Sequence, residues 1–95
     1  MAEIYKHPDG KLRRSGANSC SDRDLLAIIL NTGTSKYSAE KISEMVFEKF
    51  GSLNNLMGKR LSELIKIEGI GEVKATQIAA LFELTKRIIK KLETE

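Results

Sequence analysis

The chain has 95 residues, of which 41% are hydrophobic and 31% charged, and its formal net charge at pH 7 is +3. This length and composition predict one folded domain, and the longest apolar run, Leu25 to Leu30, is far too short to span a bilayer. The single cysteine cannot form an internal disulfide and residues 1–10 lack the apolar core of a signal peptide, so a cytoplasmic protein is expected.

The first twenty residues show no clear hydrophobic period and are predicted to form an N-terminal arm, with one helical turn at Lys11–Arg14. The pattern sharpens at Ser21, which is a good N-cap residue. Two aspartates follow it, and negative charge suits the first turn of a helix. A helix is therefore expected up to Leu30, where a run of turn residues, 31–35, ends it.

The rest of the chain reads as further helices joined by short turns. Apolar spacing predicts helices over 38–50, over 53–57 and from Leu61 toward Gly69, and a long last helix from about Glu72. No stretch shows the alternation of a strand. The sequence therefore predicts an all-α bundle of about five helices, with a helical domain at 21–92 and a tail at 93–95. Its expected core is Leu26, Ile29, Ile42, Val46, Phe50, Leu64, Ile70, Ile78 and Phe82.

Two glycines flank one isoleucine just before the last helix, at Gly69-Ile70-Gly71. A single glycine would end the preceding helix, so the second indicates a sharp turn, and positive φ angles are expected at both. Ile70 is expected to point into the core. The backbone amides around Gly69, Ile70, Gly71 and Val73 would then face outward at a helix N-terminus, where they suit a phosphate, with the Lys74 side chain adding positive charge.

The segment LSELIKIEGIGEVKATQIAALFEL, residues 61–84, resembles a helix–hairpin–helix motif, which implies binding to DNA without sequence preference. Glu68 and Glu72 depart from a simple anion site, because both carboxylates would stand near a bound phosphate. A tight turn without any ligand remains the alternative interpretation of the glycines.

A longer stretch, about residues 11–90, resembles the N-terminal helical region of RadC-like (UPF0758) proteins. The resemblance rests on SDRDLLAIIL at 21–30, TGT at 32–34, FGSL at 50–53 and the Gly-Ile-Gly turn. It implies a bacterial protein with a DNA-associated role, labelled as DNA repair. Members of this family usually continue into a metallopeptidase-like domain with a zinc site, and a partnership with such a domain, absent from this chain, is implied.

Catalysis is not expected from these residues. If residues 31–36 form a second hairpin, the two hairpins together also resemble the core of helix–hairpin–helix DNA glycosylases. In the bifunctional enzymes of that class, a nucleophilic lysine lies two positions after the second glycine. That position is Val73 here, and Lys74 is one step out of register. His7, the only histidine, cannot assemble a metal site by itself. A non-enzymatic DNA-binding module is the preferred hypothesis, and a protein-interaction or structural module and a fragment of a repair enzyme are the alternatives.

Two further hypotheses concern phosphate contacts. The segment 31–36 is predicted to form a second, degenerate hairpin related to the first by approximate two-fold symmetry, with Thr32, Gly33, Thr34 and Lys36 as its candidate residues; a simple loop is the alternative. Near the C-terminus, the basic residues are interpreted first as a solvated helix face and second as an extended phosphate track: Lys86, Arg87, Lys90 and Lys91.

Overall fold

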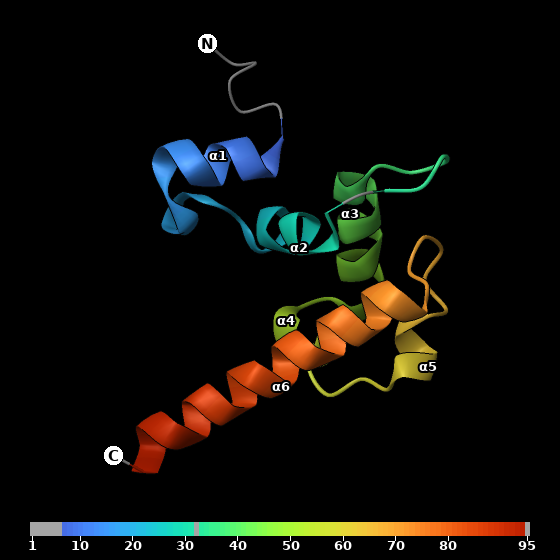
Figure 1. Ribbon diagram of the computed structural model, residues 1–95. Helices are drawn as coiled ribbons and strands as arrows, with labels where there is room; N and C mark the ends of the chain where they lie inside the picture. The colour runs from blue at the N-terminus through green and yellow to red at the C-terminus, as the bar shows by residue number, and fades with distance from the viewer. Residues whose placement is uncertain (1–6, 32, 95) are drawn as a thin grey trace.

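The computed structural model describes residues 7–31 and 33–94, and Figure 1 shows their arrangement. The predicted all-α class is confirmed, since these residues form helices and turns and no strand. The elements in chain order are α1 (Pro8–Ser15), the 3-10 turn η2 (Ala17–Ser19), α2 (Asp22–Leu30), α3 (Ala39–Phe50), α4 (Leu53–Leu56), α5 (Leu61–Leu64) and α6 (Glu72–Thr94).

Serine residues cap three of these helices at their N-termini, and the cap predicted at Ser21 is confirmed. The hydroxyl groups of Ser21, Ser38 and Ser52 each accept a hydrogen bond from a backbone amide in the first turn of α2, α3 and α4. At α2 the cap is reciprocal, because the Asp24 carboxylate accepts a hydrogen bond of 3.0 Å from the Ser21 amide. Such caps satisfy amides that a helix leaves unpaired, and they fix where each helix begins.

The Asp24 carboxylate also ties α1 to α2 through an ion pair with Lys11, 3.2 Å long. The hydrogen bond from the Ser21 amide lowers the pKa of Asp24 below its ordinary value of 3.8, and Lys11 lowers this pKa further against the opposing effect of partial burial. Because the folded-state pKa is lowered, the stability that Asp24 contributes is present above its ordinary pKa and is lost as the pH falls through the folded value.

Asp24→Ala is expected to lower the free energy of unfolding by about 1 kcal/mol at neutral pH, because it removes half of the reciprocal cap. Urea denaturation followed by circular dichroism measures this change. Asp24→Asn is the matched control, since it keeps an acceptor oxygen and loses the charge. Both variants should show a smaller loss of stability than the wild type when the pH falls below about 4. An alanine variant as stable as the wild type would contradict the role of the cap.

The core lies where α2, α3, α4, α5 and the first half of α6 meet. Six of the nine predicted core residues are buried, which confirms the prediction for Leu26, Ile42, Val46, Leu64, Ile70 and Ile78. The other three, Ile29, Phe50 and Phe82, are only partly buried, and both phenylalanines pack on the edge of the core. Among the residues that the structure describes, one polar side chain is buried with them: the Ser43 hydroxyl donates a 2.7 Å hydrogen bond to the Arg23 carbonyl and so fixes α3 against α2.

The structure differs from the sequence-based expectation at both ends of the chain and before the Gly69-Ile70-Gly71 turn. The single turn expected at Lys11–Arg14 is a two-turn helix, α1, which packs on α2. The helix expected from Leu61 toward Gly69 ends at Leu64, because the chain then turns and buries Ile67 from a non-helical segment. At the C-terminus, α6 continues through Thr94.

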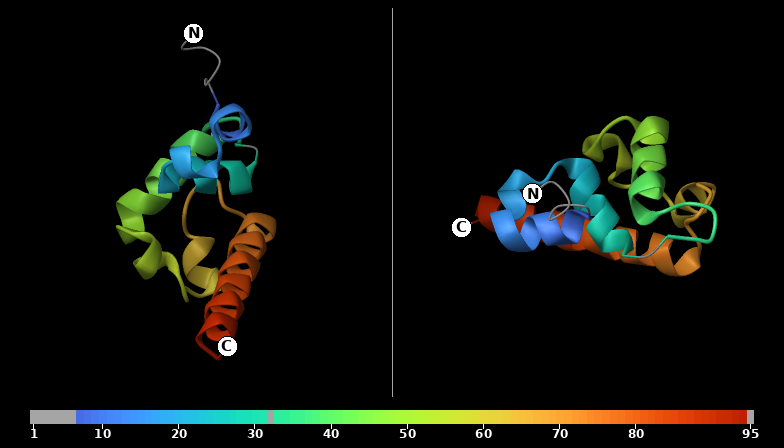
Figure 2. Two further views of the ribbon diagram at one scale, coloured as in Figure 1. Left: turned by 90° about the vertical axis from the view of Figure 1, so that its left-hand side faces the viewer. Right: turned by 90° about the horizontal axis from the view of Figure 1, so that it is seen from above.

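Helix α6 is the longest element, with 23 residues that span about 34 Å at 1.5 Å per residue. Figure 2 shows that its N-terminal half packs among the other helices and that its C-terminal half projects past them. Among the described residues, none of the helices combines the length and the apolar character that crossing a membrane would need.

Candidate nucleic-acid interface

The turn between α5 and α6 contains two glycines, and the structural role of glycine differs between the two positions. Gly69 has a φ of 95°, a conformation that glycine adopts without strain. A Cβ atom at Gly69 would lie 2.7 Å from the Cδ1 atom of Ile42, which is fully buried in α3. Both the backbone conformation and the close contact with α3 therefore require glycine at position 69.

Neither reason applies to Gly71, and the expectation of a positive φ there is wrong. The Gly71 carbonyl accepts the first hydrogen bond of α6, 3.0 Å from the Ala75 amide, so Gly71 occupies the N-cap position. A Cβ atom at Gly71 would meet no atom within 4 Å. Helix α6 thus begins with a residue that exposes its backbone to open space.

Several backbone amides at this turn have no hydrogen-bond acceptor within the described part of the chain: those of Gly69, Gly71, Glu72 and Val73. The first amides of any helix lack an intrahelical partner, but a serine hydroxyl covers this end in α2, α3 and α4. Ile70 differs from its neighbours, since its amide bonds the Ile67 carbonyl at 3.0 Å and its side chain is only 3% exposed. Ile70 therefore anchors the turn in the core, as predicted, and its amide is already used.

Lys74 lies one position beyond these amides, and its side chain turns back onto another helix. The Lys74 ammonium donates a 2.9 Å hydrogen bond to the carbonyl of Leu30, the last residue of α2. A cation is favoured at a helix C-terminus, where carbonyl groups carry partial negative charge. This contact joins α2 to α6 across 44 residues of sequence, and no local pattern predicts it.

An open hollow of about 440 Å³ adjoins the α6 N-terminus, between this end of α6 and the C-terminal end of α2. Val73, 72% exposed, gives it an apolar side chain at the surface. Sequence reasoning did not single out the two carboxamides that border it, Asn31 and Gln77. The position of Asn31 directly after the last residue of α2 could have identified it. Its φ there is 68°, a positive value that asparagine adopts more readily than most residues. The full lining is Ile29, Leu30, Asn31, Gly71, Glu72, Val73, Lys74 and Gln77.

The two glutamates beside the turn have different surroundings. Glu68 forms an ion pair of 3.3 Å with Lys36, which arrives from the segment between α2 and α3. The hydrogen bond to Glu68 and the charge of this carboxylate raise the pKa of Lys36. Glu72 makes no ion pair with any described residue, and it faces solvent in the first turn of α6. The carboxylate of Glu68 is thus partly neutralised, whereas that of Glu72 is not.

In the segment predicted to form a second hairpin, backbone amides form hydrogen bonds within the turn itself. The Thr34 hydroxyl accepts hydrogen bonds from the amides of Lys36 and Tyr37, and the Thr34 amide bonds the Tyr37 carbonyl at 2.7 Å. Gly33 is required by close backbone approach, because a Cβ atom there would collide with the Tyr37 carbonyl. Thr32 lies outside the described residues. These bonds favour the interpretation of 31–36 as an interhelical loop, and its two-fold relation to the first turn stays a prediction.

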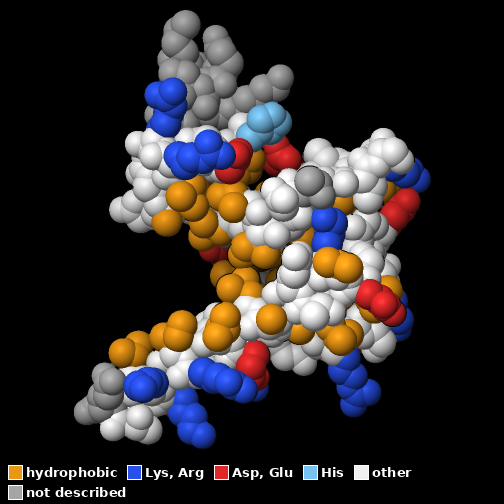
Figure 3. Space-filling model, in the orientation of Figure 1, with side chains coloured by type: hydrophobic (Ala, Val, Ile, Leu, Met, Phe, Trp, Pro, Cys, Tyr) orange, Lys and Arg blue, Asp and Glu red, His pale blue; other side chains and the backbone are white. Residues whose placement is uncertain are grey.

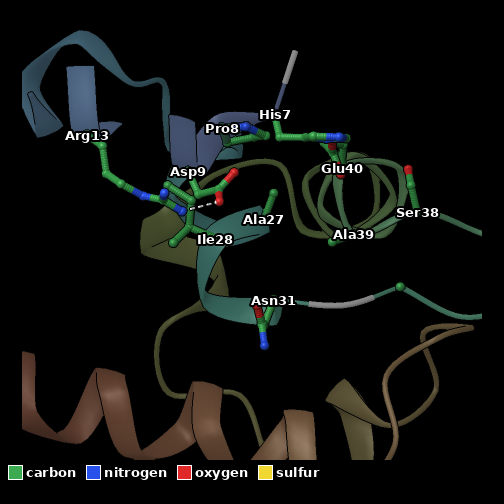
Figure 4. Close-up of a pocket in the computed structure, with 11 residues that line it drawn as sticks. His7, Pro8, Asp9, Arg13, Ala27, Ile28, Asn31, Ser38, Ala39 and Glu40 are labelled. Atoms are coloured by element: carbon green, nitrogen blue, oxygen red, sulfur yellow. Dashed lines mark hydrogen bonds and ion pairs between the residues drawn. The ribbon is translucent and has the colours of Figure 1, made fainter. Parts of the chain in front are cut away.

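A second hollow, about 530 Å³ in volume, lies between α1, α2 and the start of α3 (Figure 4). Two exposed polar contacts border it, a 3.0 Å hydrogen bond between His7 and Glu40 and a 2.6 Å ion pair between Arg13 and Asp9. The hydrogen bond from His7 lowers the pKa of Glu40. In Figure 4 the Asn31 side chain points from this hollow toward α6. Within residues 7–31 and 33–94, no three side chains of the types that ligate metals lie together.

Comparisons with known proteins agree on one family. The family model described as UPF0758 N-terminal matches residues 3–76. A UPF0758 protein of Bacillus cereus is 40% identical over 85 residues, which are 90% of this chain and 38% of that protein. A UPF0758 protein of Clostridium tetani is 44% identical over 82 residues, or 86% of this chain and 36% of that protein.

The chain thus spans little more than a third of the length of these curated relatives. No solved structure matches it significantly. The agreement between the family model and the relatives extends over most of the chain and includes the turn between α5 and α6. The chain belongs to the UPF0758 family and contains its N-terminal region.

Proposed function

We propose that this chain is a DNA-binding module that holds a backbone phosphate on the amides at the N-terminus of α6. The observation that carries the proposal is Gly71, since neither a positive φ nor a packing contact in the folded chain requires glycine there. The absence of a side chain leaves the amides of Gly71, Glu72 and Val73 open to close approach from outside. Such amides at the positive end of a helix dipole suit a phosphate oxygen.

The charges near the turn support a weak site. Lys74 lines the same hollow as Gly71 and places a positive charge beside the amides. The pairing of Lys36 with Glu68 reduces the repulsion that Glu68 would exert on a phosphate. Glu72 is exposed at the helix end and makes no ion pair with a described residue. Because the positive and negative side chains near the turn nearly cancel, we expect hydrogen bonds from the backbone amides to contribute most of the phosphate binding. The net charge of these side chains should contribute little.

The expected binding is independent of DNA sequence and does not involve catalysis. Amides aimed at phosphates carry no information about the bases. The resemblance of residues 61–84 to a helix–hairpin–helix motif supports this mode, and the family resemblance supports DNA in the bacterial cytoplasm as the partner. We infer a non-enzymatic role for this region, because the residues at the turn offer amides and one lysine that is already bonded to a carbonyl.

The salt dependence of DNA binding tests the proposal. If two or three phosphates are neutralised, log K should fall with log salt concentration at a slope of about −2 to −3 for duplex DNA. Fluorescence anisotropy on duplexes of unrelated sequence, and on a branched duplex, measures this slope. Equal affinity for the unrelated duplexes is expected. A folded chain that binds no DNA even at low salt would overturn the proposal and leave the turn a structural element.

Two sets of variants separate the lysine at the turn from the basic residues near the C-terminus. Lys74→Met removes the charge and keeps the length of the side chain, and it should flatten the slope by about one for every sequence. Circular dichroism must accompany it, because the bond to Leu30 is lost as well.

Replacing Lys86, Arg87, Lys90 and Lys91 together by glutamine should leave binding nearly unchanged. Glu83 already pairs with the first two of these, at 4.0 and 2.9 Å.

A further inference from the structure

The hollow at the start of α6 offers room for more than a phosphate group. Its volume is about 440 Å³, and its lining comes from the end of α2 and from the first two turns of α6. Pockets that take whole small molecules begin at about 300 Å³. Figure 3 shows basic and hydrophobic side chains together on the face where these two helix ends meet. The side chains of this hollow therefore decide what can accompany a phosphate bound to the amides.

Two carboxamides at this hollow, those of Asn31 and Gln77, are exposed and make no hydrogen bond to another described residue. Asn31 directly follows α2, and its side chain points toward α6 in Figure 4. Gln77 lies on the second turn of α6. A carboxamide donates and accepts hydrogen bonds at the same time, which matches the edge of a nucleobase. Asparagine and glutamine bind adenine in this way, through its N6 amino group and its N7 atom.

Apolar side chains border the same hollow. Val73 is 72% exposed on the α6 side, and Ile29 is half-buried on the α2 side. Pockets for an unpaired base combine hydrogen bonds to its edge with apolar contact to its faces. The Glu72 carboxylate lines the hollow too, and it can accept a hydrogen bond from the amino group of a base. The lining thus supplies both kinds of contact that a nucleobase needs.

We infer that this hollow takes one unpaired nucleobase, held between Asn31 and Gln77 beside the phosphate on the amides. The inference rests on the proposed function, because the base arrives on the same DNA strand as that phosphate. In a continuous duplex every base is paired and stacked, so only the phosphate is bound. A base in a single-stranded overhang is free to enter the hollow, since taking it out of the stack costs least there. The chain therefore binds DNA with unpaired nucleotides more tightly than blunt duplex.

Three labelled duplexes that share one paired sequence test the inference by fluorescence anisotropy at low salt. In the first, one strand extends past both ends as adenine nucleotides. In the second, the same extensions carry abasic sugars, which keep the phosphates and lack the bases. The third duplex is blunt. The adenine overhangs should bind about tenfold more tightly than the abasic ones, because two carboxamides gain hydrogen bonds to the base. The abasic and blunt duplexes should bind with similar affinity.

Two variants locate the base in this hollow. Asn31→Gly removes one carboxamide and keeps a residue that adopts the positive φ at position 31. Gln77→Met removes the other and keeps the length of the side chain on an exposed face of α6. The double variant should bind adenine overhangs no more tightly than abasic ones. Thr76→Met is the matched control, because Thr76 is exposed next to Gln77 and does not line this hollow. It should keep the preference, and circular dichroism checks the fold of every variant.

The outcomes distinguish this inference from the proposed function. Equal affinity for adenine and abasic overhangs would overturn the inference, and the proposed function would stand if Gly71→Val still weakens binding to blunt duplex. A preference for adenine that the double variant keeps would place the base elsewhere and would also overturn the inference. A folded chain that binds none of the three duplexes would overturn both.

Discussion

Gly69→Ala is expected to lower the free energy of unfolding by about 2–5 kcal/mol. A left-handed backbone costs a residue with a Cβ atom about 1–2 kcal/mol, and overpacking a well-filled core costs about 1–3 kcal/mol. Both penalties apply at Gly69, where φ is 95° and the new Cβ atom would lie 2.7 Å from Cδ1 and 2.9 Å from Cγ1 of Ile42. Urea denaturation at neutral pH measures the loss.

A double-mutant cycle separates the two penalties. Ile42→Val removes the nearest atom, Cδ1, so the double variant should be more stable than the sum of the single changes predicts, by about 1 kcal/mol. The remaining loss then contains the cost of the backbone conformation and of the contact with Cγ1 of residue 42, which valine keeps. Gly71→Ala is the matched control at the other glycine, and it should cost less than about 1 kcal/mol, because its Cβ atom meets open space. Equal losses for Gly69→Ala and Gly71→Ala would contradict the assignment of different roles.

Gly71→Val is expected to weaken DNA binding by about ten- to a hundredfold while the chain stays folded. A branched side chain at the N-cap would cover the amides of Glu72 and Val73, and a hydrogen bond to a charged group is worth about 1.5–3 kcal/mol. Since Gly71 has no positive φ and no close neighbour, the fold should tolerate the substitution. Anisotropy titrations at low salt, with circular dichroism on the same samples, measure both effects.

Two controls accompany Gly71→Val. Thr76→Val adds the same type of side chain at an exposed position one turn into α6, and it should leave DNA binding unchanged. Glu72→Gln should strengthen binding, because it removes an unpaired carboxylate beside the amides. Wild-type affinity in the Gly71→Val variant would reject the phosphate site at this turn. Such a result would leave the stability difference between the two glycines intact, since that difference depends on packing alone.

Local signals in the sequence were enough to place most helix boundaries. Ser21, Ser38 and Ser52 cap the helices that follow them, and the last helix begins at Glu72 as predicted. Each signal acts within one helical turn, so a short stretch of sequence contains all the interacting groups. The burial of Ile70 is also local in origin, because an apolar residue between two glycines in a turn has only the core to pack against.

Only the tertiary structure distinguished the two glycines of the turn. The sequence presents Gly69 and Gly71 symmetrically, and a positive φ was expected at both. What makes them different is Ile42, 27 residues before Gly69 in sequence, whose side chain occupies the space beside one glycine and not the other. The positions of the charges were likewise decided by contacts between distant segments, since Lys74 bonds Leu30 and Lys36 pairs with Glu68.

The difference in burial between the two halves of α6 likewise depends on the tertiary structure. Apolar residues recur at helical spacing from Ala75 to Leu92, and this spacing predicts that the segment is a helix. Which of these side chains are covered depends on where the other helices lie, and they reach only the first half of α6. Hydrophobic periodicity depends on residues that are close in sequence, so the sequence by itself determined that this segment is a helix. Burial depends on which other helices pack against it, so only the tertiary structure decided how much of α6 is left exposed.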